Sequence, residues 1–120
     1  EDIQRLKELS AKAAAEHKVH FYGFENPKVL VLVSNDTRNP DGCQDASCAA
    51  ENMMLAASSY GIGSVWLNPL MTLRNVPPLK ELLDGFGVPA GHTIWAAVAL
   101  GYPVSEGVTL QKNADVVRFV

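Results

Sequence analysis

A single domain that mixes helices and strands is predicted by three features of the sequence. The chain has 120 residues, a length that fits one domain. Helix-like and strand-like segments alternate along it, with glycine and proline between them. Hydrophobic residues make up 48% and charged residues 19%, an ordinary balance for a folded protein. Such alternation, taken alone, predicts a parallel α/β sheet.

The N-terminal third is predicted to form a helix and then a strand. Apolar residues recur there at three-to-four-residue spacing, which predicts an amphipathic helix that ends near Lys18. These apolar residues are Ile3, Leu6, Leu9 and Ala13. After a connector over 20–27, the segment 28–34 contains five consecutive apolar residues, three of them β-branched, which predicts a strand covered on both faces. A cluster of Asn, Asp, Pro and Gly over 35–42 predicts a loop.

Small side chains dominate the next segment and predict a helix over 45–60. Its small-residue face is formed by Ala46, Ala49, Met53, Ala56 and Ala57. Gly61 and Gly63 are suited to ending the helix. Because small side chains let another backbone approach closely, we expect this helix to be central or to lie at an interface.

Three shorter elements are expected in the C-terminal half. Residues 64–68 predict a short strand that is cut by Pro69. A helix is predicted to begin at Pro77, because proline is tolerated in the first turn. Residues 93–100 predict an apolar strand. The tail over 104–120 has a mixed composition that predicts no regular element.

Charge and cysteine content exclude several classes of protein. A net charge of −3 argues against nucleic-acid binding and against a polybasic membrane surface. The longest apolar run, 94–100, is far shorter than the roughly 20 residues of a membrane-spanning helix. Two cysteines, Cys43 and Cys48, without a visible secretory signal favour a reducing, cytoplasmic location.

The cysteines also raise the question of a metal or redox site. Together with His17 and His20, Cys43 and Cys48 make a zinc donor set, but the cysteine spacing is loose and the histidines lie across a helix end and a strand. We therefore interpret Cys43 as an exposed loop residue and Cys48 as a small buried one. An oxidation-prone thiol at Cys48 stays open as an alternative.

No catalytic side chain stands out elsewhere. The glycines of 61–63 and 85–91 follow helices rather than strands, so they are better helix terminators than dinucleotide-binding loops. The carboxylates are scattered without pairing; they include Glu8, Asp41, Asp45, Glu51 and Asp84. No metal ligands are therefore predicted, and an enzyme with this sequence would depend on a cofactor for its chemistry.

Several short segments, in order, carry a family resemblance. The most distinctive are Asn-Met-x-Leu-Ala-Ala within 45–57, the turn Tyr-Gly-Ile-Gly within 59–66, and Asn-Pro-Leu at 68–70. The others are 27–33, 87–91 and 99–103. With these segments the chain resembles the nitroreductase family of FMN-dependent oxidoreductases.

The resemblance implies an α+β fold, with a mostly antiparallel central sheet flanked by helices, in place of the parallel sheet. It implies a homodimer with FMN at the interface, which suits the alanine-rich helix. It also implies that NAD(P)H passes hydride to FMN and that a nitroaromatic, quinone or similar acceptor then takes the electrons.

The resemblance also implies which residues bind the cofactor. The flavin ring would be lined by Trp66, Leu67, Asn68 and Pro69, with an amide or polar group near the flavin N5 atom. Lys112 would contact the FMN phosphate, and Gln111 beside it would stand in place of an arginine.

One departure from the family pattern concerns the start of the chain. The arginine-rich segment with which the family opens is absent, so residues 1–120 are expected to form one nitroreductase-like domain that is incomplete at its N-terminus. The alternative function is a flavin-binding or interaction domain of the same fold without nitroreductase activity.

Overall fold

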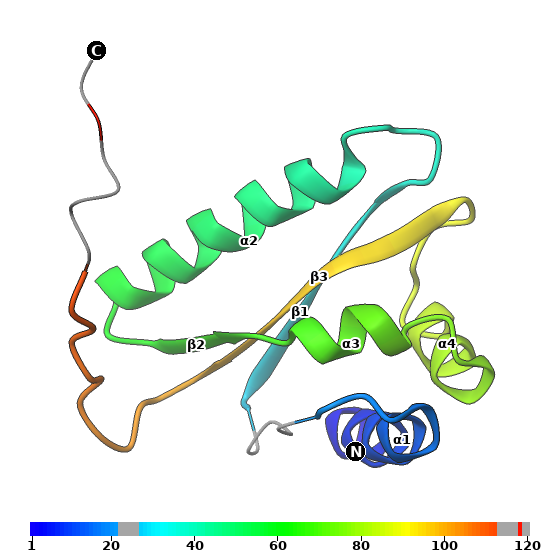
Figure 1. The fold of residues 1–120 in the computed structure, drawn as a ribbon, viewed down its shortest axis with the longest axis horizontal. Helices are drawn as coiled ribbons and strands as arrows, with labels where there is room; N and C mark the ends of the chain where they lie inside the picture. Colours follow the sequence, from blue (N-terminus) through cyan, green and yellow to red (C-terminus); the bar gives the residue numbers. More distant parts are fainter. Residues whose placement is uncertain (22–26, 113–117, 119–120) are drawn as a thin grey trace.

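The computed structural model describes residues 1–21, 27–112 and 118. In chain order its elements are α1 (Asp2–His17), β1 (Val29–Asp36), α2 (Gly42–Ser59), β2 (Gly63–Trp66), α3 (Asn68–Leu73), α4 (Pro77–Asp84) and β3 (His92–Gly101) (Figure 1). None of the helices in this described part is long and apolar enough to cross a lipid bilayer.

The sheet has the order β1-β3-β2, and β3 runs antiparallel to both neighbours. Val29 lies opposite Leu100 on one side of β3, and Gly63 lies opposite Gly101 on the other. The α+β prediction with an antiparallel sheet is confirmed, and the parallel sheet suggested by alternation alone is wrong. The alternation misleads because β1 and β2 do run in the same direction with α2 between them, but β3 occupies the place between those strands.

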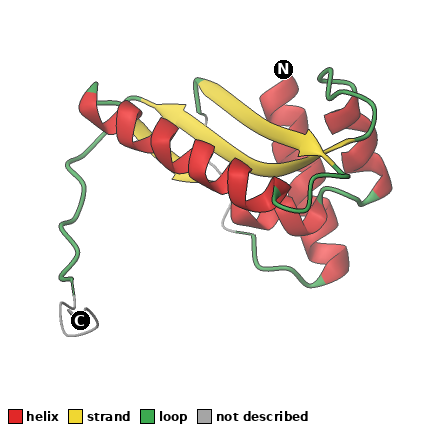
Figure 2. Ribbon diagram, turned by 90° about the horizontal axis from the view of Figure 1, so that it is seen from above, coloured by secondary structure: helices red, strands yellow, loops and turns green. Residues whose placement is uncertain are grey.

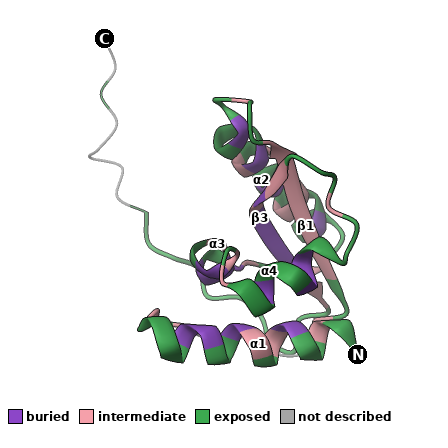
Figure 3. Cartoon of the chain, turned by 90° about the vertical axis from the view of Figure 1, so that its right-hand side faces the viewer, coloured by how far each residue is buried: buried purple, intermediate pink, exposed green. Residues whose placement is uncertain are grey.

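Helices cover the two faces of the sheet unequally. Helix α2 lies alone across one face, whereas α1, α3 and α4 gather on the other (Figures 1 and 2). The larger core cluster joins the three helices to β3 and includes Leu6, Leu70, Leu73, Leu79, Leu83, Ile94 and Ala97. The smaller cluster lies under α2 and contains Ala46, Ala50, Ala96 and Val98. The central strand β3 is therefore the most buried strand (Figure 3).

The predicted close approach of α2 is confirmed where Ala46 and Ala50 pack on β3. Two details of the prediction are wrong. The helix begins at Gly42, so Cys43 is helical, and Cys48 is exposed rather than buried. The reason is helical periodicity, because a face that turns Ala46 and Ala50 toward the sheet turns Cys48 away from it.

Strand β1 packs against the core clusters on both faces of the sheet, through Leu30 and Leu32 on one face and Val33 on the other, but it is less buried than its apolar composition predicts. Val29 is 50% exposed, and the remaining residues of β1 are only half-buried. The strand lies at the edge of the described sheet, where one side has no neighbouring strand. Apolar composition predicts a strand correctly here but overestimates how much of it this chain covers.

The region around Pro69 also differs from the prediction. Strand β2 ends at Trp66, and residues 68–73 form the short helix α3 instead of a strand end and turn. Pro69 is the second residue of α3, where its fixed φ fits and its missing N–H costs no hydrogen bond. From Tyr102 to Lys112 the chain has no helix or strand and is exposed throughout.

Candidate functional site

The predicted ring-contact segment, 66–69, forms the junction between β2 and α3. Trp66 is the last residue of β2, and Asn68 is the first residue of α3. Between them, the Leu67 N–H donates a hydrogen bond of 2.9 Å to the Ala97 carbonyl oxygen. This bond extends the pairing of β2 with β3 by one residue and fixes the point at which α3 begins.

Only one residue of this segment faces solvent. Leu67 and Pro69 are buried, and Trp66 is half-buried beneath α2. Asn68 is exposed. A ligand that approaches the junction from solvent therefore meets the backbone and side chain of Asn68, supported from behind by apolar packing.

The Asn68 N–H is a hydrogen-bond donor that the fold leaves free. As the first residue of α3 it has no partner one turn earlier, and no acceptor for it is found among the described residues. Pro69 has no N–H, and the Leu70 N–H donates to the Leu67 carbonyl oxygen at 3.2 Å. The Trp66 Nε1 atom is buried and has no hydrogen-bond partner in the part of the chain that the structure describes. The junction thus presents one unused backbone donor to solvent.

Arg74 lies at the other end of the same segment, and the sequence analysis did not identify it as a site residue. It is the C-cap residue of α3. Its Nε atom donates to Thr93 Oγ1 at 3.3 Å, and its guanidinium lies 4.8 Å from the centre of the Trp95 ring. The signal in the sequence that could have pointed to Arg74 is its single positive charge directly after the largely apolar stretch 65–73.

Lys112 is not brought to this segment within one chain. The tail leaves the sheet after Gly101, which pairs with Gly63 at the start of β2, whereas the junction follows the other end of β2. The tail then runs along the side of the molecule where α2 ends, away from α3 (Figures 1 and 2). Lys112 is exposed there, so its contact with a phosphate remains a prediction.

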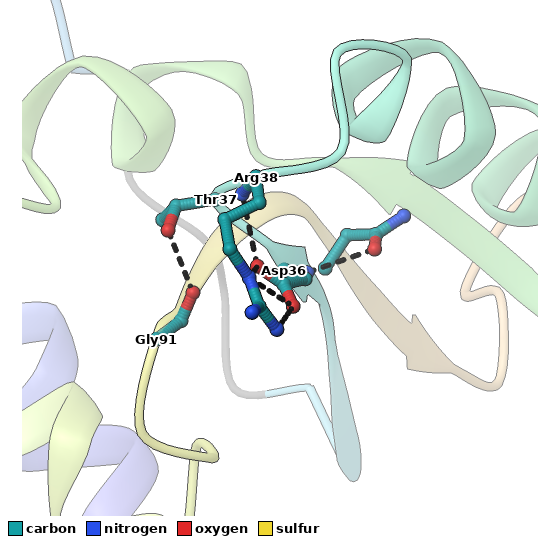
Figure 4. A network of polar contacts seen from close by, with 5 residues as sticks. Asp36, Thr37, Arg38 and Gly91 are labelled. Carbon is teal, nitrogen blue, oxygen red and sulfur yellow. Dashed lines mark hydrogen bonds and ion pairs between the residues drawn. The ribbon is translucent and has the colours of Figure 1, made fainter.

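A polar network lies elsewhere, in the loop between β1 and α2 (Figure 4). The Arg38 Nε atom donates to both carboxylate oxygens of Asp36, at 3.0 and 3.1 Å, and Thr37 Oγ1 donates to the Gly91 carbonyl oxygen at 2.9 Å. Hydrogen bonds from Arg38 lower the pKa of Asp36 below its ordinary value of 3.8. Since Arg38 neutralises the carboxylate, this network braces two loops rather than serving as an acid or base.

The remaining sequence candidates are not assembled into a site. In the described part of the chain no group of three or more His, Cys, Asp or Glu residues could hold a metal ion. Asp45 instead accepts a hydrogen bond from the Asn39 side chain at 2.9 Å. Gly61 and Gly87 have positive φ angles in the turns that follow α2 and α4, as expected for helix terminators. The expectation is wrong for Gly63, which begins β2, and for Gly91, which lies at positive φ in the turn before β3.

Two open grooves lie beside strands of the sheet. One, of about 520 Å³, includes Gly63, Val65, Gly101 and Tyr102. The other, of about 450 Å³, lies between α1 and β1 and includes Leu6 and Phe86. Neither contains residues of the 66–69 junction, so neither supplies a closed pocket for a ring placed there.

Comparison with known protein families shows which family this chain belongs to. The sequence model of the Nitroreductase family matches residues 2–102, which include the sheet, all the described helices and the 66–69 junction. The chain belongs to the nitroreductase family. Lys112 lies outside the matched region.

Two curated archaeal relatives carry the name "Putative NADH dehydrogenase/NAD(P)H nitroreductase". The protein from Archaeoglobus fulgidus is 44% identical over 63 residues, which are 52% of this chain and 34% of the relative. The protein from Methanothermobacter thermautotrophicus is 36% identical over 99 residues, covering 74% of this chain and 48% of the relative. The chain therefore spans about a third and about half of the lengths of these two nitroreductase-family relatives.

Solved structures agree with the family assignment. A nitroreductase with bound FMN from Bacteroides fragilis is 31% identical, with a TM-score of 0.83, and the match covers 99% of this chain and 70% of that one. A nitroreductase with bound FMN from Desulfitobacterium hafniense has a TM-score of 0.80 at 17% identity, with the same coverage. The second likeness supports the nitroreductase fold alone.

The residues of the junction fit the ring part of FMN. A flavin ring is flat and apolar over its faces and carries hydrogen-bond acceptors along one edge. The unused Asn68 N–H, backed by the buried Leu67 and Pro69, offers a donor for that edge. The described residues beside the junction offer no comparable group for the phosphate, apart from Arg74, which is already engaged.

Proposed function

We propose that this chain acts as an FMN-dependent oxidoreductase of the nitroreductase type. In this proposal NAD(P)H is the hydride donor, and a nitroaromatic, quinone or similar compound is the acceptor. The observation that carries the proposal is the free Asn68 N–H at the start of α3. Its support is the 31% identity, over 99% of this chain, to a nitroreductase whose structure was solved with bound FMN.

When bound, FMN would accept hydride from the donor and pass electrons on to the acceptor. The chain's own part is to hold and tune the ring. Leu67 and Pro69 supply an apolar support, Trp66 fixes the end of β2, and the Asn68 N–H donates toward the ring edge near N5. A donor at that position favours the electron-rich, reduced ring, because it stabilises the charge that develops there.

We also propose that the chain acts as a homodimer. Val104, Val108 and Leu110 in the tail are each at least 78% exposed, and Val65 on β2 is 51% exposed. Val65 and Val104 line the same groove, and exposed apolar side chains of this kind are typical of surfaces that another protein covers. A second copy would also give Lys112 a route to the phosphate of an FMN molecule that its own chain's geometry does not offer. The cytoplasmic location expected from the sequence stays a prediction.

The direct test is the visible spectrum of the purified chain, recorded before and after addition of FMN and desalting. Retention of a yellow flavin spectrum, bleached anaerobically by NADH or NADPH and restored by a nitroaromatic or a quinone, is the expected result. A chain that retains FMN but is bleached by neither nucleotide would refute the proposed donor. A chain that retains no FMN would refute FMN binding by these 120 residues.

The alternative is a flavin-binding or interaction domain of the same fold without nitroreductase activity. It is favoured by the path of the tail that carries Lys112, because this tail leaves the sheet opposite Gly63, at the end of β2 away from the junction. The two functions differ in turnover. Retained flavin without steady-state NAD(P)H consumption, over a panel of nitroaromatic and quinone acceptors, would identify the alternative.

A further inference from the structure

The segment that joins β2 to α4 is fastened to β3 at both of its ends. At its start the Leu67 N–H donates to the Ala97 carbonyl oxygen at 2.9 Å. At its end Arg74 donates to Thr93 Oγ1 at 3.3 Å. Helix α3 therefore spans two fixed points on one strand, and the Asn68 N–H lies next to the first of them.

The second fixed point rests on an irregularity in β3. Val33 pairs with Ala96, but Ser34 pairs with Ile94, so Trp95 is the extra residue of a β-bulge. Its ring packs in the cluster under α2, and a Cβ atom at Gly42 would lie only 3.0 Å from its Nε1 atom. The Trp95 ring is thus held from the α2 side and offers Arg74 a fixed surface.

Arg74 makes three different contacts, which an arginine can combine and a lysine cannot. Its Nε atom donates to Thr93 Oγ1, its Nη1 atom donates to the Met71 carbonyl oxygen in the last turn of α3, and its guanidinium carbon lies over the Trp95 ring, 4.8 Å from the ring centre. The bond to Met71 ties the guanidinium to the last turn of α3. The other two contacts tie it to β3.

We propose that Arg74 is a positioning residue that fixes α3, and with it the direction of the Asn68 N–H, against β3. Without the Arg74 contacts, α3 is held to β3 by the hydrogen bond from the Leu67 N–H and by the apolar packing of Leu70 and Leu73. The helix can then tilt about these points. A tilt of the first turn of α3 changes where the Asn68 N–H points, because no hydrogen bond to a described residue holds this N–H in place. The link to the flavin rests on the function proposed above, but the link to α3 does not.

The test compares Arg74→Lys and Thr93→Val with Lys80→Gln as the matched control. Lys80 lines the same small cavity of about 40 Å³ as Arg74 and Thr93, but its ion pair is with Asp84 on its own helix. Amide hydrogen exchange is measured on the chain without flavin. We expect exchange in 67–73 to quicken by about tenfold in Arg74→Lys, with a smaller change of the same kind in Thr93→Val and none in Lys80→Gln.

A second readout uses the chain loaded with FMN. We expect Arg74→Lys to shift the flavin midpoint potential and to alter the visible circular dichroism, while Lys80→Gln leaves both at wild-type values. A tenfold to hundredfold fall in kcat is expected from a donor displaced by about 1 Å.

Unchanged exchange in 67–73, or exchange that quickens equally in every element, would overturn the positioning role. Unchanged potential and dichroism in FMN-loaded Arg74→Lys would overturn its link to the flavin. A wild-type chain that binds no FMN would refute the proposed function instead, and the exchange comparison would still decide whether Arg74 fixes α3.

Discussion

Asn68 carries two groups that could meet a ligand, its side-chain amide and its backbone N–H, and substitution can separate them. Asn68→Ala removes the amide and keeps the N–H. Asn68→Pro removes the N–H as well, at the first position of a helix, where proline is well tolerated. If the backbone donor holds the flavin, Asn68→Pro should weaken FMN binding by about tenfold to a hundredfold, the cost of one lost hydrogen bond to a buried acceptor.

The measurement is a fluorescence titration of FMN, with far-ultraviolet circular dichroism to confirm that each variant is folded. We expect Asn68→Ala to bind within about threefold of the wild type, because an exposed side chain contributes little. Equal FMN affinities for the wild type and a folded Asn68→Pro variant would show that the Asn68 N–H does not bind FMN. A large loss in Asn68→Ala would move the contact to the side chain.

Asp36 leads to a prediction about acid stability. Its pKa is lowered by hydrogen bonds from Arg38, so the carboxylate is more easily ionised in the folded chain than in the unfolded one. The stabilisation that follows is present above the ordinary pKa of 3.8 and is lost as the pH falls below it toward the folded-state pKa. The effect is small because the pair is exposed to solvent.

Asp36→Asn keeps the oxygen that accepts the Arg38 backbone N–H but removes the charge. We expect it to lower the urea midpoint at pH 7 and to have less effect at pH 3, where the wild-type carboxyl is becoming protonated. Arg38→Gln should behave in the same way. An identical difference between wild type and Asp36→Asn at both pH values would contradict the assignment.

At the scale of elements, the sequence predicted best where one local signal decides the outcome. The amphipathic spacing of α1, the proline at the start of α4 and the apolar run of β3 each predicted an element whose bounds agree within a residue or two. Helix α3 was missed because Pro69 was interpreted as a strand breaker, although the same residue is equally at home in a first helical turn. Local pattern could not decide between these two roles, because burial of Leu70 and Leu73 against α1 and β3 is what selects the helix.

The contact between α2 and β3 gives a prediction of packing. Alanine at Gly42 would gain helix propensity, by less than about 1 kcal/mol at a helix end. Its Cβ would lie 3.0 Å from Trp95 Nε1, and the guanidinium of Arg74 over the Trp95 ring restricts how far the ring can move away. Overpacking of this kind costs about 1–3 kcal/mol, so Gly42→Ala should destabilise the chain by about 1 kcal/mol in urea unfolding.

Trp95→Phe supplies the control for this prediction, because phenylalanine lacks the Nε1 atom. In that background Gly42→Ala should be neutral or slightly stabilising, and the two substitutions should not be additive. A stabilising effect of Gly42→Ala in the wild-type background would show that Trp95 can move away from α2. It would also weaken the view of Trp95 as a fixed surface.

At the scale of the whole molecule, the candidate site is only partly predictable from one sequence. Trp66, Leu67, Asn68 and Pro69 are consecutive, so their proximity needed no tertiary information, but the free Asn68 donor depends on α3 and emerged only with the fold. The Arg74 contact depends on a bulge that brings Trp95 under a cation twenty-one positions earlier in the chain. Lys112 is the opposite case, since its predicted role requires a second chain.

That requirement leads to a prediction about assembly. Val108 and Leu110 are 87% and 78% exposed. Burial of such side chains on a partner stabilises association by about 1.5–3 kcal/mol each. Val108→Asp with Leu110→Asp should therefore raise the dimer dissociation constant by about a hundredfold or more. Thr109→Asp adds one negative charge between them, half of the charge of the double variant, at another exposed position, and should have much less effect.

Sedimentation velocity over a range of protein concentrations measures this directly, and an FMN titration of the same samples links assembly to the cofactor. If Lys112 reaches FMN across a dimer, the double variant should lose FMN affinity in parallel with association, and Lys112→Gln should lose affinity while remaining dimeric. A wild-type chain that is monomeric yet binds FMN tightly would exclude the shared site. A dimer in which Lys112→Gln binds FMN normally would keep the assembly and remove Lys112 from the phosphate contact.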